Sequence, residues 1–237
     1  PRETQKVLIK KIQPGYVGLL ALTGMAFFVW TQVLNQPDDR LHLTLLDGEG
    51  TVLVQSPGGG VVLVGGGSSP SHLKQILGER LPIIRPEVDW VVVASPAQAD
   101  LNALLGGIAA DRVEEVLWGV DPSANQTSRS VYVQYQDQSL PIAAMAEGHA
   151  LDLGNGIKLE VLAREDKGAV LWLAWENFSA LIPAGKVEGA WLKLPGAPDV
   201  ILLPDDITVA GLPLSTINAW APSVILMPLK ESDLPIQ

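Results

Sequence analysis

The sequence predicts an α/β domain in which helices cover short apolar strands, with one long apolar helix ahead of it. Short apolar runs recur along most of the chain, and clusters of glycine, proline and serine separate them. Such runs are typical of strands buried on both faces of an α/β sheet. The 237 residues suffice for one domain of about 200 residues with an appendage.

The uncharged segment from Gly15 to Leu34 predicts a single membrane-spanning helix. Its 20 residues would rise about 30 Å, the hydrocarbon thickness of a bilayer. Tyr16 and Trp30 lie toward its ends, where aromatic rings favour the membrane interface. A cleaved signal peptide and a buried core helix are the alternatives.

The charges on either side of this segment predict its orientation. Basic residues before it, and two aspartates after it, favour a cytoplasmic N-terminus and an extracytoplasmic domain at the cell membrane: Arg2, Lys6, Lys10, Lys11, Asp38 and Asp39. We therefore divide the chain into residues 1–37 (basic stub, transmembrane helix and linker) and a folded domain at 38–237. The segment from Gly15 to Leu34 makes membrane lipid one expected partner, and other membrane-protein subunits a second.

The first half of the domain reads as an antiparallel meander followed by β-α units. Strands are expected at residues 41–45, 51–55 and 61–64, with turns at 47–50 and 56–60. A helix follows at 71–77, with Ser69 or Ser71 as its cap. A buried strand at 90–94 then leads into a helix that ends near Gly106 and Gly107.

The second half repeats this style. Alternation of Val131 and Val133 with Tyr132 and Tyr135 predicts a strand whose tyrosines are exposed. Further strands are expected at residues 157–163, 169–175, 178–182, 200–203 and 224–227, and helices at 187–192 and 215–220.

Composition excludes several kinds of chemistry. The chain has no cysteine, which rules out disulfides, thiolate ligands and a cysteine nucleophile. The formal net charge of −10 argues against nucleic-acid binding, which needs clustered Lys and Arg. His42, His72 and His149 show no metal-ligand spacing, which favours surface or structural roles.

Five segments occur in the order, and beside the strands, that are typical of a known kind of site. Leu46-Asp47-Gly48-Glu49-Gly50-Thr51 precedes a strand that ends at Val64-Gly65-Gly66-Gly67. Ser95-Pro96-Ala97-Gln98-Ala99-Asp100 follows the strand at 90–94. Ile182-Pro183-Ala184-Gly185 and Pro204-Asp205-Asp206-Ile207-Thr208 come later. In these segments the chain resembles the C-terminal metallo-β-lactamase-like domain of ComEC-type competence proteins, the DNA-uptake channels. The resemblance implies a four-layer αβ/βα sandwich.

The resemblance also implies a dismantled metal site. The family places histidines and aspartates at the matching positions, whereas this chain carries Gly65, Ser95, Ala97, Asp100, Gly185, Asp205 and Asp206. Hydrolysis at two metals needs imidazole and carboxylate ligands that converge on an open site. We therefore expect no catalytic residue, no metal and no cofactor. A carboxylate-only site for Mg²⁺ or Ca²⁺, built from Asp47 and the three aspartates above, is the alternative.

These expectations favour a membrane-anchored pseudoenzyme that serves as a structural or binding subunit of a membrane-associated complex. The alternative is a competence-type nuclease or phosphodiesterase that uses a rearranged acidic site. A DNA-uptake accessory that binds nucleic acid without cutting it is a third possibility, and the net charge of −10 counts against it.

Overall fold

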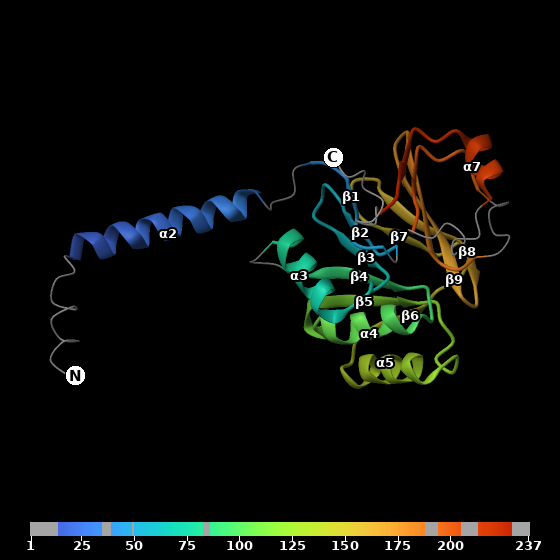
Figure 1. The fold of residues 1–237 in the computed structure, drawn as a ribbon, viewed down its shortest axis with the longest axis horizontal. Coiled ribbons are helices and arrows are strands. Elements are labelled where there is room, and N and C mark those ends of the chain that lie inside the picture. The colour runs from blue at the N-terminus through green and yellow to red at the C-terminus, as the bar shows by residue number, and fades with distance from the viewer. Residues whose placement is uncertain are drawn as a thin grey trace, which may run out of the picture.

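In the part of the chain that the structure describes, twelve strands form two six-stranded sheets packed face to face (Figure 1). The structure, a computed structural model, describes residues 14–34, 39–48, 50–82, 86–187, 194–204 and 213–228. The first sheet has the order β1-β2-β3-β4-β5-β6, antiparallel up to β3 and parallel from β3 onward. Its strands are β1 (His42–Leu45), β2 (Val52–Gln55), β3 (Val61–Val64), β4 (Val88–Val93), β5 (Val113–Trp118) and β6 (Ile142–Ala144).

The second sheet has the order β12-β11-β10-β9-β8-β7 and the same combination of ladders. Its antiparallel part runs from β7 to β10, and β10, β11 and β12 are parallel. The strands are β7 (Ala150–Asp152), β8 (Lys158–Glu165), β9 (Gly168–Trp175), β10 (Phe178–Gly185), β11 (Val200–Leu202) and β12 (Val224–Leu226).

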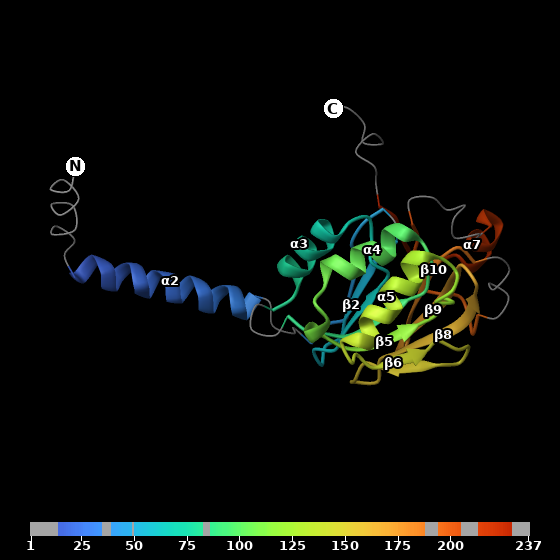
Figure 2. The same cartoon turned by 90° about the horizontal axis from the view of Figure 1, so that it is seen from below.

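The core has three layers of apolar contact. The central layer lies between the sheets, where residues such as Val64 and Val92 meet Leu171 and Leu173. Helices α3 (Pro70–Arg80), α4 (Gln98–Gly107) and α5 (Gln126–Asp137) cover the outer face of the first sheet (Figure 2). Helix α7 (Leu214–Trp220) packs against the second sheet through Ile217. The predicted four-layer α/β arrangement is therefore confirmed.

Helix α3 begins where its cap was expected. The Ser69 side chain accepts a hydrogen bond from the His72 amide at 3.4 Å, and Pro70 occupies the first helical position. A serine cap satisfies an amide that has no partner within the helix, and proline is well tolerated at that position. Of the two serines predicted as possible caps, Ser69 is the one that caps the helix, and Ser71 lies inside it.

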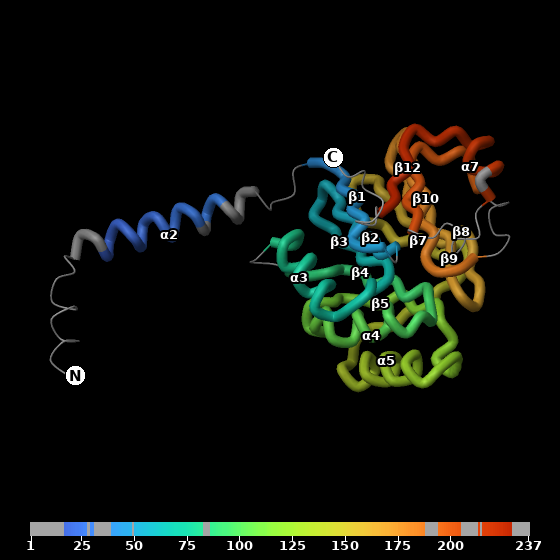
Figure 3. The backbone as a smooth tube through the Cα atoms, viewed as in Figure 1, coloured from blue at the N-terminus to red at the C-terminus, as the bar shows by residue number. Residues whose placement is uncertain are grey.

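Helix α2 (Pro14–Leu34) extends away from the sandwich (Figure 3). Side chains are described for residues 17–27, 29 and 30. Large apolar side chains here are strongly exposed, among them Leu20 at 73%, Phe27 at 70% and Trp30 at 65%. The helical state predicted for this segment is confirmed. Within the described residues, no helix meets the length and apolarity needed to cross a bilayer.

The strand predicted around Val131–Tyr135 is wrong, because these residues form the centre of α5. The Asn125 side chain caps this helix by accepting a hydrogen bond from the Ser128 amide at 2.8 Å. Ser128, Val131 and Tyr135 are all buried, at spacings of three and four that fit a helix face. The exposed residue is Val133, not Tyr135, and the high strand propensity of valine and tyrosine is overridden by packing and the cap.

The other predicted elements agree with the structure to within a few residues where the chain is described. The sequence did not identify β5 or β6, nor the short 3-10 helix η1 (Ala110–Arg112) before β5. The helix predicted at 187–192 lies outside the described residues beyond Val187, as does most of the linker at 35–38.

Candidate functional site

The predicted site positions converge on the edge where parallel strands of the first sheet end. The loop after β3 carries Gly65, and the Gly65 amide donates to the Val92 carbonyl of β4 at 3.0 Å. The loop after β4 carries Ser95. From the second sheet, Gly185 at the end of β10 reaches the same place: a Cβ atom on Gly185 would lie 2.9 Å from that of Ser95. The sandwich therefore brings Gly65, Ser95 and Gly185 to one edge.

The Asp100 carboxylate organises the glycine loop after β3. Its Oδ1 atom accepts hydrogen bonds from the amides of Gly67 at 2.9 Å and Gly66 at 3.3 Å. Asp100 lies in the first turn of α4, where the helix dipole also favours a negative charge. In this structure the Asp100 carboxylate therefore accepts hydrogen bonds from the backbone of the glycine loop.

The Asp47 carboxylate holds the same loop from the other side. Its Oδ1 accepts from the Thr51 amide at 3.2 Å, and its Oδ2 accepts from the Ser68 amide at 3.0 Å. A Cβ atom on Gly67 would overlap this carboxylate, so the loop approaches it closely, and Gly67 has a φ of +85° that suits glycine. Asp47 and Asp100 together accept hydrogen bonds from the amides of Gly66, Gly67 and Ser68 and so hold the glycine loop at residues 65–68.

Thr51 is a polar residue of this edge that sequence reasoning did not single out. Its side chain is 1% exposed, and its hydroxyl has no hydrogen-bond partner. A Cβ atom on Gly65 would lie 3.6 Å from the Thr51 hydroxyl and 3.7 Å from Asp100 Oδ1. The available signal was the position of a hydroxyl residue directly after the 47–50 turn.

The space that a side chain at position 185 would need is already filled. A Cβ atom on Gly185 would overlap the Lys167 carbonyl and would lie 3.1 Å from the Gly168 Cα atom. The φ of +75° at Gly185 also favours glycine. The backbone at position 185 therefore leaves no room for the side chain of an aspartate.

Arg164 is the second residue that the sequence did not reveal. It comes from β8, and its Nε donates to the Gly119 carbonyl at 2.8 Å. A longer bond of 3.4 Å runs from Nη1 to the Met145 carbonyl. Arg164 therefore joins the second sheet to the ends of β5 and β6. A single arginine at the end of an alternating strand was the only sequence signal.

Asp121 is held as a carboxylate by its own loop. Its Oδ1 accepts from the amide and the hydroxyl of Ser123, each at 2.8 Å. These two bonds, assisted by the positive charge of Arg164, lower the pKa of Asp121 below its usual range. The Asp121 carboxylate therefore stabilises the local turn at residues 121–123.

The remaining predicted positions do not complete a site. Ala97 is exposed at the start of α4, where its amide donates to Ser95 Oγ at 3.2 Å. The three histidines lie apart, on β1, on α3 and in the turn before β7. Asp205 and Asp206 lie outside the described residues; their neighbour Pro204 packs near the 47–50 turn, since a Cβ atom on Gly50 would lie 3.3 Å from Pro204 Cβ.

The donor set that the described residues supply at this edge does not fit a two-metal hydrolytic centre. Its carboxylates at positions 47 and 100 bind backbone amides, and the other matched positions described are glycine, serine and alanine. Such a centre uses imidazole and carboxylate ligands around an open coordination position. In the part of the chain that the structure describes, no three His, Cys, Asp or Glu side chains are grouped to hold a metal ion.

Solved structures with the same architecture identify the fold as metallo-β-lactamase-like. The metallo-β-lactamase fold protein YhfI from Bacillus subtilis aligns with a TM-score of 0.51 and 12% identity, covering 80% of this chain and 97% of that one. CmlA, a diiron β-hydroxylase from Streptomyces venezuelae, aligns with a TM-score of 0.50 and 13% identity, covering 81% of this chain.

The likeness to these proteins concerns the fold alone. This chain spans only 45% of CmlA. No family model and no curated relative matches the sequence. The mixed α/β metallo-β-lactamase-like fold predicted from the sequence is thus confirmed, while the closer resemblance to ComEC-type domains stays a prediction.

Proposed function

We propose that this chain is a catalytically inactive metallo-β-lactamase-like domain that acts as a structural or binding subunit of a membrane-associated complex. The observation that carries the proposal is the use of Asp47 and Asp100 as backbone clamps for the glycine loop. Each carboxylate stabilises the folded backbone through two amide hydrogen bonds, and among the described residues neither belongs to a group of three His, Cys, Asp or Glu side chains that could hold a metal ion.

The packing at Gly185 gives independent support. Lys167 and Ser95 occupy the space through which a bridging side chain would reach the metals. Restoring an aspartate at this position would require the turn between β8 and β9 to move. Several changes would therefore be needed together to recover a hydrolytic site, whereas the sheets that frame it remain fully packed.

The decisive experiment combines metal analysis with an activity assay. The full chain is purified in mild detergent, incubated with Zn²⁺ or Mn²⁺, desalted, and assayed on bis(p-nitrophenyl) phosphate. We expect substoichiometric metal and no turnover above the detergent blank. Stoichiometric metal with turnover that Asp100→Ala abolishes and Asp137→Ala leaves intact would contradict the proposal, and would favour the acidic-site phosphodiesterase instead.

We propose further that the segment containing α2 attaches the domain to a membrane. Exposed apolar side chains point to all sides of this helix rather than along one stripe, which calls for an apolar environment around it: Val17, Leu19, Leu20, Leu22, Met25, Phe27, Val29 and Trp30. Lipid or the apolar helices of a membrane partner would supply that environment. The basic residues ahead of it favour a cytoplasmic N-terminus.

Fractionation tests the attachment. The full chain should stay in the membrane pellet after an alkaline carbonate wash, and a variant lacking residues 1–38 should move to the supernatant. Protease added to spheroplasts should digest the domain if it faces outward. Equal behaviour of the two chains in the carbonate wash would refute membrane attachment, and a protected domain would refute the orientation.

A further inference from the structure

The sandwich has two ends, and the edge that carries the predicted site positions, here called the site edge, occupies one of them. Strand β10 reaches the site edge at Gly185, beside Ser95, so the first residues of β10 lie at the opposite end. The start of β1 lies at this opposite end too, because His42 pairs with Gln55 and Gln55 pairs with Val61, the first residue of β3. We call it the linker end, because the chain enters the domain there.

Helix α2 and strand β1 are joined by a short connection. The helix ends at Leu34, and the strand begins eight residues later at His42. Eight residues span at most about 28 Å when fully extended. Strand β9, with eight residues, separates the two ends of the sandwich by about 25 Å. A membrane that holds α2 is therefore nearest to the linker end, and the site edge lies on the far side of the domain.

An aromatic hairpin lies at the linker end, between β9 and β10. Trp175 ends β9, Phe178 begins β10, and the two residues are paired in the ladder. Both side chains are half-buried and pack against the central layer, whereas Glu176 and Asn177 are exposed at the tip. Tryptophan combines an apolar ring with a polar N–H group, which favours the headgroup region of a bilayer.

The neighbouring strands extend this apolar surface. Ala180 of β10 pairs with Val200, which begins β11, and Val200 pairs with Val224, which begins β12. The Val224 side chain is 45% exposed, and half-buried Val200 packs against the central layer. Three adjacent strands therefore present apolar side chains at the linker end, from Phe178 to Val224.

Charged side chains beside the hairpin have both signs. Lys158 lies next to it, because it pairs with Ala174 on one side and with Asp152 on the other. Arg40 precedes β1, and Glu176 lies in the hairpin tip. A surface of mixed sign gains little from anionic lipid, because the attractive and repulsive contributions offset each other. Its apolar and aromatic side chains therefore decide whether it binds a membrane.

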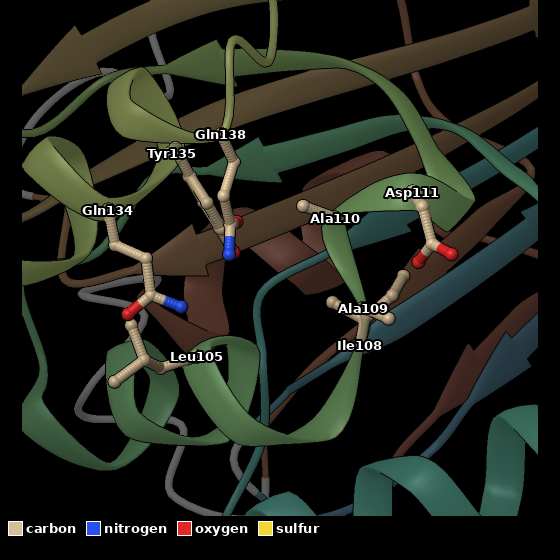
Figure 4. Close-up of a pocket in the computed structure, with 8 residues that line it drawn as sticks. All are labelled: Leu105, Ile108, Ala109, Ala110, Asp111, Gln134, Tyr135 and Gln138. Atoms are coloured by element: carbon tan, nitrogen blue, oxygen red, sulfur yellow. The ribbon is translucent and has the colours of Figure 1, made fainter.

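The helical side of the linker end is less suited to lipid. Asp111, two residues before β5, lies there at a cavity of about 470 Å³ between α5 and the connection from α4 to β5 (Figure 4). The polar side chains of Gln134 and Gln138 also line this cavity. Removing a carboxylate and two amides from water is unfavourable unless new partners replace it. The hairpin side is therefore the part of this end that fits lipid.

We propose that the aromatic hairpin of the membrane-attached chain docks in the headgroup region of the lipid bilayer, with the site edge turned away from the membrane. This docking requires the proposed attachment through α2, and it fixes which end of the domain faces lipid. Trp175 and Phe178 enter the interface, and the charged side chains around them stay in the aqueous layer.

Site-directed spin labelling tests this docking, because the chain has no cysteine of its own. The full chain carries one nitroxide label in each of three variants, Asn177→Cys, Asp166→Cys and Leu22→Cys, and is placed in nanodiscs of zwitterionic phosphatidylcholine. The labels report on the hairpin tip, the turn at the other end of β9 and the exposed surface of α2. Power saturation of the EPR signal measures collisions with a water-soluble nickel chelate and with lipid-soluble oxygen.

The Leu22 label should be shielded from the chelate and accessible to oxygen, which verifies the attachment. The Asn177 label should lose accessibility to the chelate and gain accessibility to oxygen relative to the Asp166 label, which is the matched control on the same strand pair. Adding anionic phosphatidylglycerol should leave these differences unchanged, because the charges beside the hairpin have both signs.

The other outcomes overturn the docking in distinguishable ways. Equal chelate accessibility of the Asn177 and Asp166 labels, with Leu22 shielded, would retain the attachment and refute the docking. A Leu22 label that the chelate reaches would refute the attachment, and the docking with it. Shielding of Asn177 only in the presence of phosphatidylglycerol would refute the aromatic basis of the contact. Shielding only in membranes of the expressing cells would indicate a protein partner at the hairpin in place of lipid.

Discussion

Replacing Asp100 by alanine should lower the stability of the domain, because the glycine loop after β3 loses its acceptor. Two amides, those of Gly66 and Gly67, point at this carboxylate at 3.3 and 2.9 Å. A hydrogen bond to a charged group contributes about 1.5–3 kcal/mol. The longer bond is the weaker one, and the half-buried side chain lets water replace part of the loss. The expected cost is about 2–3 kcal/mol.

The conservative variant Asp100→Asn separates a structural role from metal binding. Asparagine keeps a carbonyl acceptor for the two amides and loses only the charge at the start of α4, at a cost of about 1 kcal/mol. A metal ligand would behave differently, since loss of the charge would remove most of the coordination energy. Asp137→Ala, at the exposed end of α5, is the control and should change stability by less than about 0.5 kcal/mol.

Urea unfolding of the full chain in detergent, followed by tryptophan fluorescence, measures these differences. With an m value of about 2.5 kcal/mol/M, Asp100→Ala should lower the midpoint by about 1 M and Asp100→Asn by less than half of that. The reasoning is refuted if the alanine variant matches the wild-type midpoint. It is equally refuted if both variants lose the same stability and Zn²⁺ or Mn²⁺ raises the midpoint of the wild type alone.

Four further substitutions probe other features of the fold. Gly66→Ala should lower the free energy of unfolding by about 3 kcal/mol or more, because the new methyl group would overlap the carbonyl of Asp100 in the first turn of α4. Gly78→Ala lies in open space within α3 and should instead raise the free energy of unfolding by up to about 1 kcal/mol. Thermal unfolding of the two variants measures this difference. Asn125→Ala removes the cap of α5 and should cost about 1 kcal/mol in urea unfolding; an unchanged midpoint would argue against that cap. Burial raises the pKa of the Tyr135 phenol, so the unfolded chain releases this proton first, near pH 10, and stability should fall as pH rises above about 10. Tyr135→Phe should flatten that fall between about pH 10 and 11, and urea midpoints across this range measure it; equal slopes would contradict the assignment.

The strands were predictable where buried apolar runs are bounded by turn residues. Val61–Val64 is fully buried between two turns, and a run of four apolar, mostly β-branched residues between turns is typical of a buried strand. The strand β5 (Val113–Trp118) was missed because it carries Glu114 and Glu115 on a partly exposed stretch, and β6 has only three residues. For α5, alternating valine and tyrosine suggested a strand, and the deciding signals were the Asn125 cap and the burial of Val131 with Tyr135.

The candidate site was predictable in position but not in chemistry. Gly65, Ser95 and Gly185 do meet at one edge, since strand ends of the two sheets fix their places. The hydrogen bonds from backbone amides to Asp100 depend on the conformation of the glycine loop. No pattern in a single sequence predicts that conformation. Arg164 shows the same limit, because its carbonyl partners come from strands far away in the sequence.

The order of the strands has a consequence for how the chain can be divided. Among the described residues, the first sheet uses residues 42–144 and the second uses residues 150–226, so each ladder described is completed within its own half. Contact between the halves is mainly through apolar side chains of the central layer, with Arg164 as a polar link. A break in the exposed connection at Ala146–Gly148 would leave both ladders whole. During synthesis, the inner face of the first sheet would stay exposed to solvent until the second sheet had been made. Two separately expressed halves should therefore associate and restore the sandwich by complementation.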